Sequence, residues 1–141
     1  MRYSLRTFLI ATALIAVVLA VSVLAFRAFH YGIDDGYAQW GAAEMVMGYM
    51  DDNSGKWPPD WEALRSRFDD GGSRVGGWSF EKYKSRVWID FDADPVELRR
   101  FSLESDKPSF NVIGATHYTG VYVGDDPNTM LWNYFRSDVE P

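Results

Sequence analysis

The 141-residue chain contains no cysteine and only two histidines. The absence of cysteine excludes disulfide bonds, cysteine-ligated zinc, thiolate catalysis and covalently attached haem. A catalytic histidine needs a nucleophile within reach and an acid to orient it. Beyond the N-terminal region the only histidine is His117, and the best serine motif, GGSRV around Ser73, lacks the final glycine of G-x-S-x-G. We therefore expect no serine triad.

Motifs that bind phosphates or nucleotides are also missing. The glycine pairs at residues 71–72 and 76–77 match neither the G-x-x-x-x-G-K-[ST] nor the G-x-G-x-x-G spacing, so they predict a loop. The chain offers no set of base, nucleophile and oxyanion donors. The sequence predicts a protein that is not an enzyme and has no catalytic, cofactor-binding or metal site. A hydrolase that uses two of the 20 acidic side chains is the alternative left open.

Acidic side chains are absent before Asp34. Arg2, Arg6 and Arg27 are the only charged side chains there, so residues 31–141 hold 11 basic and 20 acidic side chains, a net charge of −9. A domain this acidic repels the phosphates of nucleic acids, and we expect no nucleic-acid partner. It also repels anionic lipid headgroups, so we do not expect it to lie flat on a membrane.

The N-terminal region does contain a long hydrophobic run. Residues 8–26, FLIATALIAVVLAVSVLAF, include no charge and only two hydroxyl side chains, Thr12 and Ser22. A helix of this length spans the hydrocarbon layer of a bilayer, which is roughly 30 Å thick. Two arginines precede the run and one follows it, which predicts a cytoplasmic N-terminus. We therefore predict a single-pass anchor in the cell membrane, with the remaining domain extracytoplasmic or periplasmic.

A cleaved signal peptide is the alternative interpretation. Val23-Leu24-Ala25 has small residues at the spacing that a signal peptidase recognises, and cleavage there would release a secreted domain beginning at Phe26. The apolar run is longer than the roughly 7–15 residues of a usual signal peptide, which favours the anchor. A buried core helix is disfavoured, because no comparable apolar segment could cover it on all sides.

We expect two parts: an anchor with a short cytoplasmic tail over residues 1–30, and an acidic domain over residues 31–141. Aromatic residues make up 16% of the chain, which supports a folded core. A helix is predicted over residues 34–50, capped by Asp34 or Asp35. Two of its glycines, Gly41 and Gly48, would allow close packing against a neighbour. Its apolar stripe consists of Trp40, Ala43, Met47 and Met50.

The rest of the domain combines helix and strand signals. A short helix beginning at Asp60 should bury Trp61, Leu64 and Phe68. From residue 78 apolar and polar residues alternate, which predicts strands over residues 86–92, 98–104, 109–116 and 118–123. Asp126 as cap and Pro127 at the first position predict a short C-terminal helix. The predicted fold class is α+β, with helices packed on an antiparallel sheet of three to four strands.

Two acidic segments offer oxygen ligands of the kind that calcium prefers. Asp90, Asp92 and Asp94 begin like an EF-hand loop, but proline and phenylalanine stand where its glycine and glutamate are required. We interpret these three acids as the exposed side of a strand edge. The second segment consists of Asp125, Asp126 and Asn128. A helix cap explains two of its members, so calcium binding there is only an alternative.

The segment YMDDNSGKWP at residues 49–58, followed by Trp61 and Leu64, resembles the end of the long helix in type II secretion pseudopilins. In that family the helix ends in an Asn-Gly type turn, followed by a basic residue, an aromatic residue, a proline, and a leucine in a short helix. The order of the parts is similar as well, which implies an apolar helix with an amphipathic continuation and a small antiparallel sheet. Residues 2–8 lack the glycine and glutamate of a prepilin leader.

These features predict a structural or protein-interaction domain held at the membrane through residues 8–26, with a protein partner or further copies of the chain. The alternative is a module that binds a peptide, a glycan or calcium, secreted if the apolar segment is removed. Three tryptophans motivate this alternative, because Trp57, Trp61 and Trp78 could form an aromatic platform. A core and an interface explain so many aromatic residues more simply.

Overall fold

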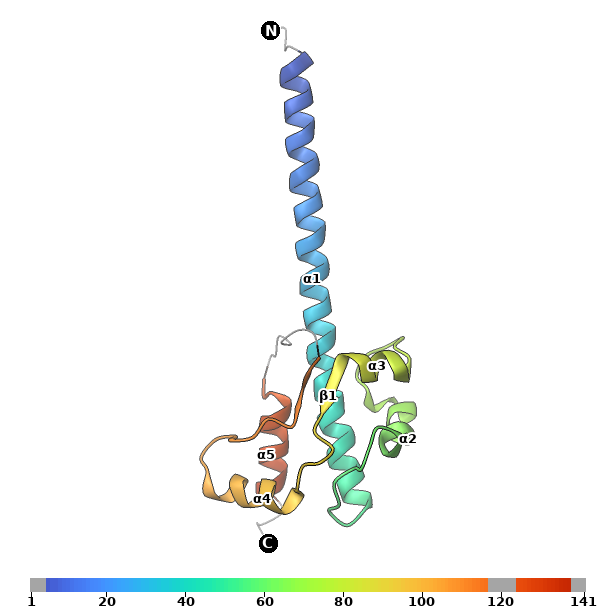
Figure 1. Cartoon of the computed structure of the whole chain (residues 1–141), viewed down its shortest axis with the longest axis vertical. Coiled ribbons are helices and arrows are strands. Elements are labelled where there is room, and N and C mark those ends of the chain that lie inside the picture. The colour runs from blue at the N-terminus through green and yellow to red at the C-terminus, as the bar shows by residue number, and fades with distance from the viewer. Residues whose placement is uncertain (1–4, 117–123, 138–141) are drawn as a thin grey trace. The chain divides into compact units, whose positions relative to one another are not determined.

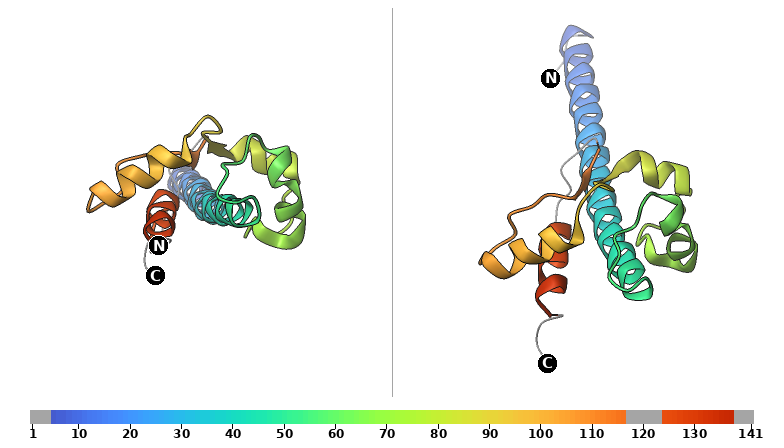
Figure 2. Two further views of the ribbon diagram at one scale, coloured as in Figure 1. Left: turned by 90° about the horizontal axis from the view of Figure 1, so that it is seen from below. Right: turned by 60° about the horizontal axis from the view of Figure 1, so that its bottom comes forward.

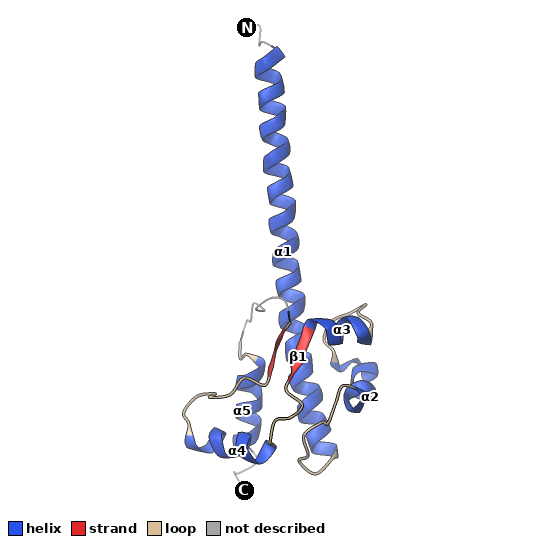
Figure 3. Ribbon diagram, in the orientation of Figure 1, coloured by secondary structure: helices blue, strands red, loops and turns tan. Residues whose placement is uncertain are grey.

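The computed structural model describes residues 5–116 and 124–137. The chain divides into two compact units, Met1–Tyr31 and Gly32–Pro141. The fold is α+β, because a two-stranded antiparallel sheet accompanies the helices (Figure 1 and Figure 3). In chain order the elements are α1 (Leu5–Asp52), the 3₁₀ helix η1 (Glu62–Leu64), α2 (Arg65–Arg67), the π-helical turn η2 (Phe68–Gly72), α3 (Phe80–Arg86), β1 (Val87–Ile89), α4 (Pro95–Glu104), β2 (Ile113–Ala115) and α5 (Pro127–Ser137).

Helix α1 is longer than the sequence pattern indicates. The predicted helix start at Asp34 or Asp35 is wrong, because both residues lie inside α1. No proline occurs between the apolar run and residue 50. A single glycine weakens a helix by only about 1 kcal/mol, so Gly32 and Gly36 do not end it. The helix stops where predicted, in the turn after Asp52: Ser54 and Gly55 have positive φ angles, and the Gly55 amide donates to the Met50 carbonyl at 2.8 Å.

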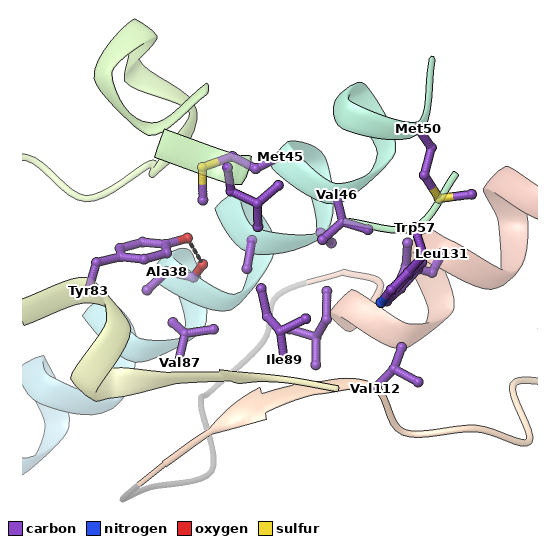
Figure 4. Packing of buried hydrophobic residues seen from close by; sticks show 14 of the residues in the cluster. Ala38, Met45, Val46, Met50, Trp57, Tyr83, Val87, Ile89, Val112 and Leu131 are labelled. Carbon is purple, nitrogen blue, oxygen red and sulfur yellow. Dashed lines mark hydrogen bonds between the residues drawn. The ribbon is translucent and has the colours of Figure 1, made fainter. Parts of the chain in front are cut away.

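The hydrophobic core of the second unit forms on two sides of the later part of α1. Figure 2 shows α2 and α3 on one side of this helix and α4 and α5 on the other. Of the predicted stripe, Ala43 and Met50 are buried, whereas Trp40 and Met47 are partly exposed. Because the helix is covered from two directions, burial extends beyond one stripe. The further buried apolar side chains of this part of α1 are Ala38, Ala42, Met45 and Val46 (Figure 4).

Two glycines bring other segments close to α1, as the sequence predicts. A Cβ atom on Gly41 would lie 2.5 Å from the Ser73 carbonyl oxygen, which is backbone and cannot move aside easily. A Cβ atom on Gly48 would lie 2.5 Å from the Arg67 guanidinium. That guanidinium donates to the Gly48 carbonyl at 2.7 Å. Glycine is therefore required at position 41 by close approach of backbone, whereas a side chain at position 48 would have to displace the flexible end of Arg67.

The short helical segment after Asp60 packs as predicted. Asp60 Oδ1 accepts a hydrogen bond from the Ala63 amide at 2.9 Å, which satisfies one free donor at the start of η1. Leu64 is fully buried, and the partly buried Trp61 and Phe68 pack against the core. This aromatic layer fixes η1, α2 and η2 against the flank of α1 on which α3 also lies.

The sheet consists of two strands among the described residues, so the expected three to four strands are not found. β1 pairs antiparallel with β2, and Trp88 lies opposite Gly114. Val87 and Ile89 are buried and Trp88 is exposed, which confirms the predicted alternation. Residues 80–86, in the stretch where alternation was expected, form α3, whose N-cap is Ser79. The strand predicted over residues 118–123 lies outside the described residues.

Residues 98–104 form part of helix α4 and not a strand. Asp94 Oδ1 accepts from the Val96 amide at 2.9 Å, and Pro95 occupies the first turn. This is a strong helix start, since the proline nitrogen needs no partner there and the aspartate caps a free amide. Leu98 and Ser102, four residues apart, form the buried face of the helix. Local capping therefore overrides the alternation that suggested a strand.

Helix α5 begins and packs as predicted. Asp126 Oδ1 accepts from the amides of Asn128 and Thr129 at 2.9 and 3.2 Å, and Leu131 and Phe135 are buried. At its other end, Arg136 Nη1 donates to the carbonyls of Ser102 and Ser105 at 3.3 and 3.2 Å. These carbonyls lie at the C-terminal end of α4, where a positive charge is favourable. The arginine thus joins α4 to α5.

Candidate functional site

The apolar segment of α1 is a candidate membrane anchor. Among the described residues, one helix is long and apolar enough to cross a bilayer, and its most apolar window is not buried at all. The two hydroxyl side chains are satisfied within the helix, since Thr12 donates to the Phe8 carbonyl at 2.9 Å and Ser22 to the Val18 carbonyl at 2.8 Å. This segment thus presents no unpaired side-chain donor to lipid. His30, just past it, contacts the Phe26 ring edge-on at 4.3 Å.

In the first acidic segment, Asp90 and Asp94 accept hydrogen bonds from backbone amides. Asp90 follows β1, and its Oδ1 accepts from the Asp92 amide at 3.1 Å, which closes a turn. Asp94 caps α4. The interpretation of the three acids as one side of a strand edge is therefore wrong, because the strand ends at Ile89 and the chain turns immediately. The tight turn and the helix cap each use one carboxylate oxygen, Oδ1 of Asp90 and Oδ1 of Asp94.

The second acidic segment is also occupied by structural hydrogen bonds. Asp126 caps α5, and the Asp125 carbonyl accepts from Trp40 Nε1 at 2.6 Å. Asn128 is bonded on both sides of its amide: Oδ1 accepts from the Val112 and Ile113 amides at 2.8 and 3.1 Å, and Nδ2 donates to the Ile113 carbonyl at 3.0 Å. These groups hold α5 against β2, which leaves little freedom for ligating a cation.

Metal-ligating side chains do not gather in the part of the chain that the structure describes. Within residues 5–116 and 124–137, no group of three or more histidine, aspartate or glutamate side chains is placed to hold a metal ion. Ser73 is buried, and its hydroxyl donates to the Val75 carbonyl at 3.3 Å. His117, the other candidate of the sequence analysis, lies outside the described residues.

The three candidate tryptophans do not form one platform. Trp57 is buried, and its Nε1 donates to the Asp90 carbonyl at 2.8 Å. Trp61 makes edge-on contacts with Phe80, Tyr83 and Phe91 at centroid distances of 6.2, 5.9 and 5.5 Å. Both therefore belong to the core. Trp78 is different, because it lies at the end of the glycine-rich loop and lines a surface groove.

That groove, with a volume of about 390 Å³, lies beside residues 69–78. These residues comprise the later part of η2 and most of the loop that connects η2 to α3 (Figure 1). Its lining residues include the partly exposed Phe68 and Trp78, the exposed Asp69 and the glycines of the loop. A second cleft of about 330 Å³ lies where the end of α1 meets α4 and α5, lined by Met50, Val96 and Phe135 among others. Both clefts belong to the second unit.

Sequence analysis did not identify two buried polar contacts of the second unit, one made by Asp35 and the other by Tyr83. Asp35 is 1% exposed, and its carboxylate accepts two hydrogen bonds from the Arg86 guanidinium, one of them at 2.8 Å. The Tyr83 hydroxyl donates to the Ala38 carbonyl (Figure 4), and burial raises the pKa of Tyr83 far above its usual value. Only the burial of Asp35 could have been predicted from the sequence. Asp35 lies three residues before Ala38 and seven before Ala42, so the three share one face of the helix, and that face is buried.

Exposed ion pairs fix the loops on the same side of α1. Glu44 accepts two hydrogen bonds from Arg74, one of them at 2.6 Å, and this bonding raises the pKa of Arg74. A hydrogen bond from Arg65 lowers the pKa of Glu62. Both pairs are largely solvent-exposed, so each contributes little to stability. Their role is to hold the loop 69–78 and the short helices in one arrangement.

Comparisons of the chain with protein-family models, with curated proteins and with solved structures found no match.

Proposed function

We propose that the protein is a membrane-anchored domain that acts by binding another protein or further copies of itself. The single observation that carries this proposal is the apolar segment of residues 8–26, whose described side chains are exposed and whose hydroxyls are paired within the helix. Exposed apolar surface of this length is stable in lipid and not in water. The arginine distribution favours a cytoplasmic N-terminus and an extracytoplasmic domain.

In the second unit, the polar side chains that were candidate site residues make structural contacts, which supports a role in protein interaction. The acidic candidates in residues 90–94 and 125–128 satisfy backbone groups, and the buried ion pair of Asp35 and Arg86 joins α1 to the end of α3. Exposed apolar side chains occur on α4 and β1, namely Trp88, Val96, Phe101 and Leu103. Such side chains on a folded domain are suited to contact with a partner. The resemblance to pseudopilins stays a prediction and adds the expectation of lateral assembly.

Membrane insertion and orientation can be measured together because the chain has no cysteine. A single cysteine is introduced at the exposed Lys107 in one variant and at the exposed Leu5 in another. In intact cells, a membrane-impermeant maleimide should label the Lys107→Cys variant and should label Leu5→Cys only after lysis. Alkaline carbonate should leave both variants in the membrane fraction.

The opposite labelling pattern would overturn the orientation, and release of the protein by carbonate would overturn the anchor. The mass of the mature protein separates the remaining alternatives. An intact N-terminus supports the anchor, whereas a chain that begins at Phe26 is a secreted product of signal-peptide cleavage. A cut near residue 5 would favour processing like that of a pilin.

The interaction itself is tested by crosslinking in intact membranes. A photoreactive residue at Val96, which is 72% exposed, should yield a crosslinked species larger than the monomer. Recovery of monomer alone from Val96 and from a second position, Leu103, would contradict the proposed role.

A further inference from the structure

We propose that the groove beside residues 69–78 binds a neutral sugar ring, with the Trp78 side chain as the stacking surface and the Asp69 carboxylate as a hydrogen-bond acceptor. The groove lies wholly in the second unit. The proposal goes beyond the membrane role and does not require it, because a secreted domain would carry the same groove.

The loop that forms the groove is held in one conformation. Its backbone packs directly on Gly41 of α1, where no side chain could fit. Arg74 has a φ of 55°, which residues other than glycine rarely adopt, and its guanidinium is fixed by Glu44. Backbone conformations of this kind occur preferentially at binding sites, where surrounding contacts hold them. The groove is therefore formed before any ligand arrives.

The groove combines aromatic surface with accessible backbone. Phe68 and Trp78 pack against the core on one side and are partly exposed on the other. The Lys82 ammonium lies 4.4 Å from the centroid of the Trp78 ring, so a sugar would stack on the ring surface that this side chain leaves open. A Cβ atom at Gly71, Gly76 or Gly77 would meet no atom within 4 Å, so the loop leaves open space above its peptide groups. Aromatic side chains with a few polar groups are the usual lining of a small-molecule site. A pyranose has an apolar face for the ring and hydroxyl groups for the polar positions.

Charge in the groove favours a neutral ligand. Asp69 is exposed and carries a negative charge that would repel phosphate, carboxylate or sulfate groups. Arg74, which also lines the groove, pairs its guanidinium with the Glu44 carboxylate, so the charge of this arginine is offset. A hydroxyl group can instead donate to the aspartate, and this hydrogen bond is strengthened by the acceptor charge.

Size and surroundings favour a sugar over a peptide. The volume of about 390 Å³ lies near the lower end of the roughly 300–1,000 Å³ range of small-ligand sites. One mode of peptide binding adds the peptide as a strand to a sheet edge. The groove is lined by η2 and a loop, and neither β1 nor β2 contributes a lining residue.

The test uses the full chain in a detergent that contains no sugar, such as an amine oxide. Maltotriose, cellotriose and tri-N-acetylchitotriose are the probes, and tetraglycine is the peptide comparison. Binding is followed by tryptophan fluorescence and by saturation-transfer NMR up to about 10 mM ligand, which detects millimolar affinity. We expect saturable binding of at least one trisaccharide.

Variants assign the binding to the groove. Trp78→Ala should weaken trisaccharide binding by about tenfold or more, and Asp69→Asn by severalfold, because each removes one contact type. Trp88→Ala is the matched control, since Trp88 is 44% exposed but lies on β1 outside the groove. Circular dichroism checks the fold of each variant, and Asp69→Asn, at an exposed site, keeps the test valid if Trp78→Ala unfolds.

No saturable binding of any trisaccharide would overturn the proposal, as would equal affinities in the Trp78→Ala and Trp88→Ala variants. Binding of tetraglycine alone would overturn it in favour of a peptide site. None of these results bears on carbonate extraction or maleimide labelling, so failure of this proposal is distinguishable from failure of the membrane role.

Discussion

At the residue scale, the most consequential side chain is Asp35, a charged group with 1% exposure. Removal of its partner in an Arg86→Ala variant would leave a buried carboxylate without its guanidinium. We expect the free energy of unfolding to fall by about 3 kcal/mol, as is usual when one member of a buried pair is deleted. Equilibrium urea unfolding of the full chain in detergent, followed by tryptophan fluorescence, measures the change.

Two further variants show whether charge burial causes this loss. Arg100→Ala removes an exposed arginine that pairs with Glu97 at 2.6 Å, and should change stability by no more than about 0.5 kcal/mol. A double variant, Asp35→Leu with Arg86→Met, should be more stable than Arg86→Ala alone, because no unpaired charge remains. Equal destabilisation by Arg86→Ala and Arg100→Ala would contradict this account.

The second prediction at this scale concerns Tyr83. Burial raises the pKa of its hydroxyl above the usual value of about 10, so the folded protein keeps the proton that the unfolded chain loses. Stability from the neutral phenol is therefore fully present below pH 10 and decreases as the pH rises above it. Melting temperatures between pH 7 and pH 11 should fall more steeply in the natural chain than in a Tyr83→Phe variant.

The same substitution has a separate effect at neutral pH. Tyr83→Phe removes the hydrogen bond to the Ala38 carbonyl and should lower stability by about 1 kcal/mol. A Tyr37→Phe variant is the control, since Tyr37 is 44% exposed and should show neither effect. Parallel melting curves for the natural chain and Tyr83→Phe above pH 10 would contradict the buried, neutral phenol.

At the scale of elements, two nearly identical signals had different outcomes. Asp126-Pro127 was correctly interpreted as the start of α5. Asp94-Pro95 has the same cap and the same first position but was interpreted as the end of a strand, and the structure shows the start of α4. The alternation of residues 86–92 is real in β1 and ends at residue 89. The error was to predict a separate strand over residues 98–104 directly after this pair, because the pair specifies a local helix start.

The attachment of α5 to the sheet could not be predicted from local sequence, because Asn128 bonds to residues 15 and 16 positions away. An Asn128→Ala variant loses two acceptor contacts and the donor to the Ile113 carbonyl. We expect destabilisation of about 2 kcal/mol, since buried backbone groups lose their partners. Hydrogen exchange at the Val112 and Ile113 amides should accelerate.

Asn133→Ala is the matched control on the same helix. Asn133 is exposed, and its side-chain amide donates to Asp125 Oδ2 at 3.2 Å and not to β2. Its removal should therefore leave hydrogen exchange at the Val112 and Ile113 amides unchanged. Faster exchange in both variants would point to loosening of α5 as a whole and not to loss of the Asn128 contacts.

At the scale of the whole molecule, the local amino-acid composition predicted the division of the chain better than any motif did. The uncharged run of residues 8–26 predicted a candidate anchor, and the structure shows this run as exposed helix. The α+β class also followed from the sequence, because it needs only the presence of helices and of one alternating segment. The groove beside residues 69–78 could not be predicted, since its walls come from η2 and a loop whose shape depends on the Glu44–Arg74 pair and on Gly41.

The anchor makes a quantitative prediction. Val18→Arg places a charge near the middle of the apolar run, where an arginine opposes membrane insertion by roughly 2.5–3.5 kcal/mol. A double variant, Leu14→Arg with Val18→Arg, should shift most of the protein into the carbonate-soluble fraction. Val96→Arg is the control, because Val96 is exposed in the second unit, and the fraction retained in membranes should not change. Full retention of the double variant would contradict membrane insertion of this segment.

The hydrogen bonds of Asn128 have a consequence for how copies of the chain could associate. Ile113 is one of the β2 residues whose peptide groups point away from β1, and the Asn128 side chain binds both its amide and its carbonyl. A free strand edge is a template for irreversible pairing, a particular hazard for chains confined to the plane of a membrane. The Asn128 side chain therefore occupies the hydrogen-bonding groups that Ile113 would otherwise offer to another strand at this edge. Reversible assembly of neighbouring copies would therefore proceed through side-chain surfaces such as that of α4, without a continuous intermolecular sheet at β2.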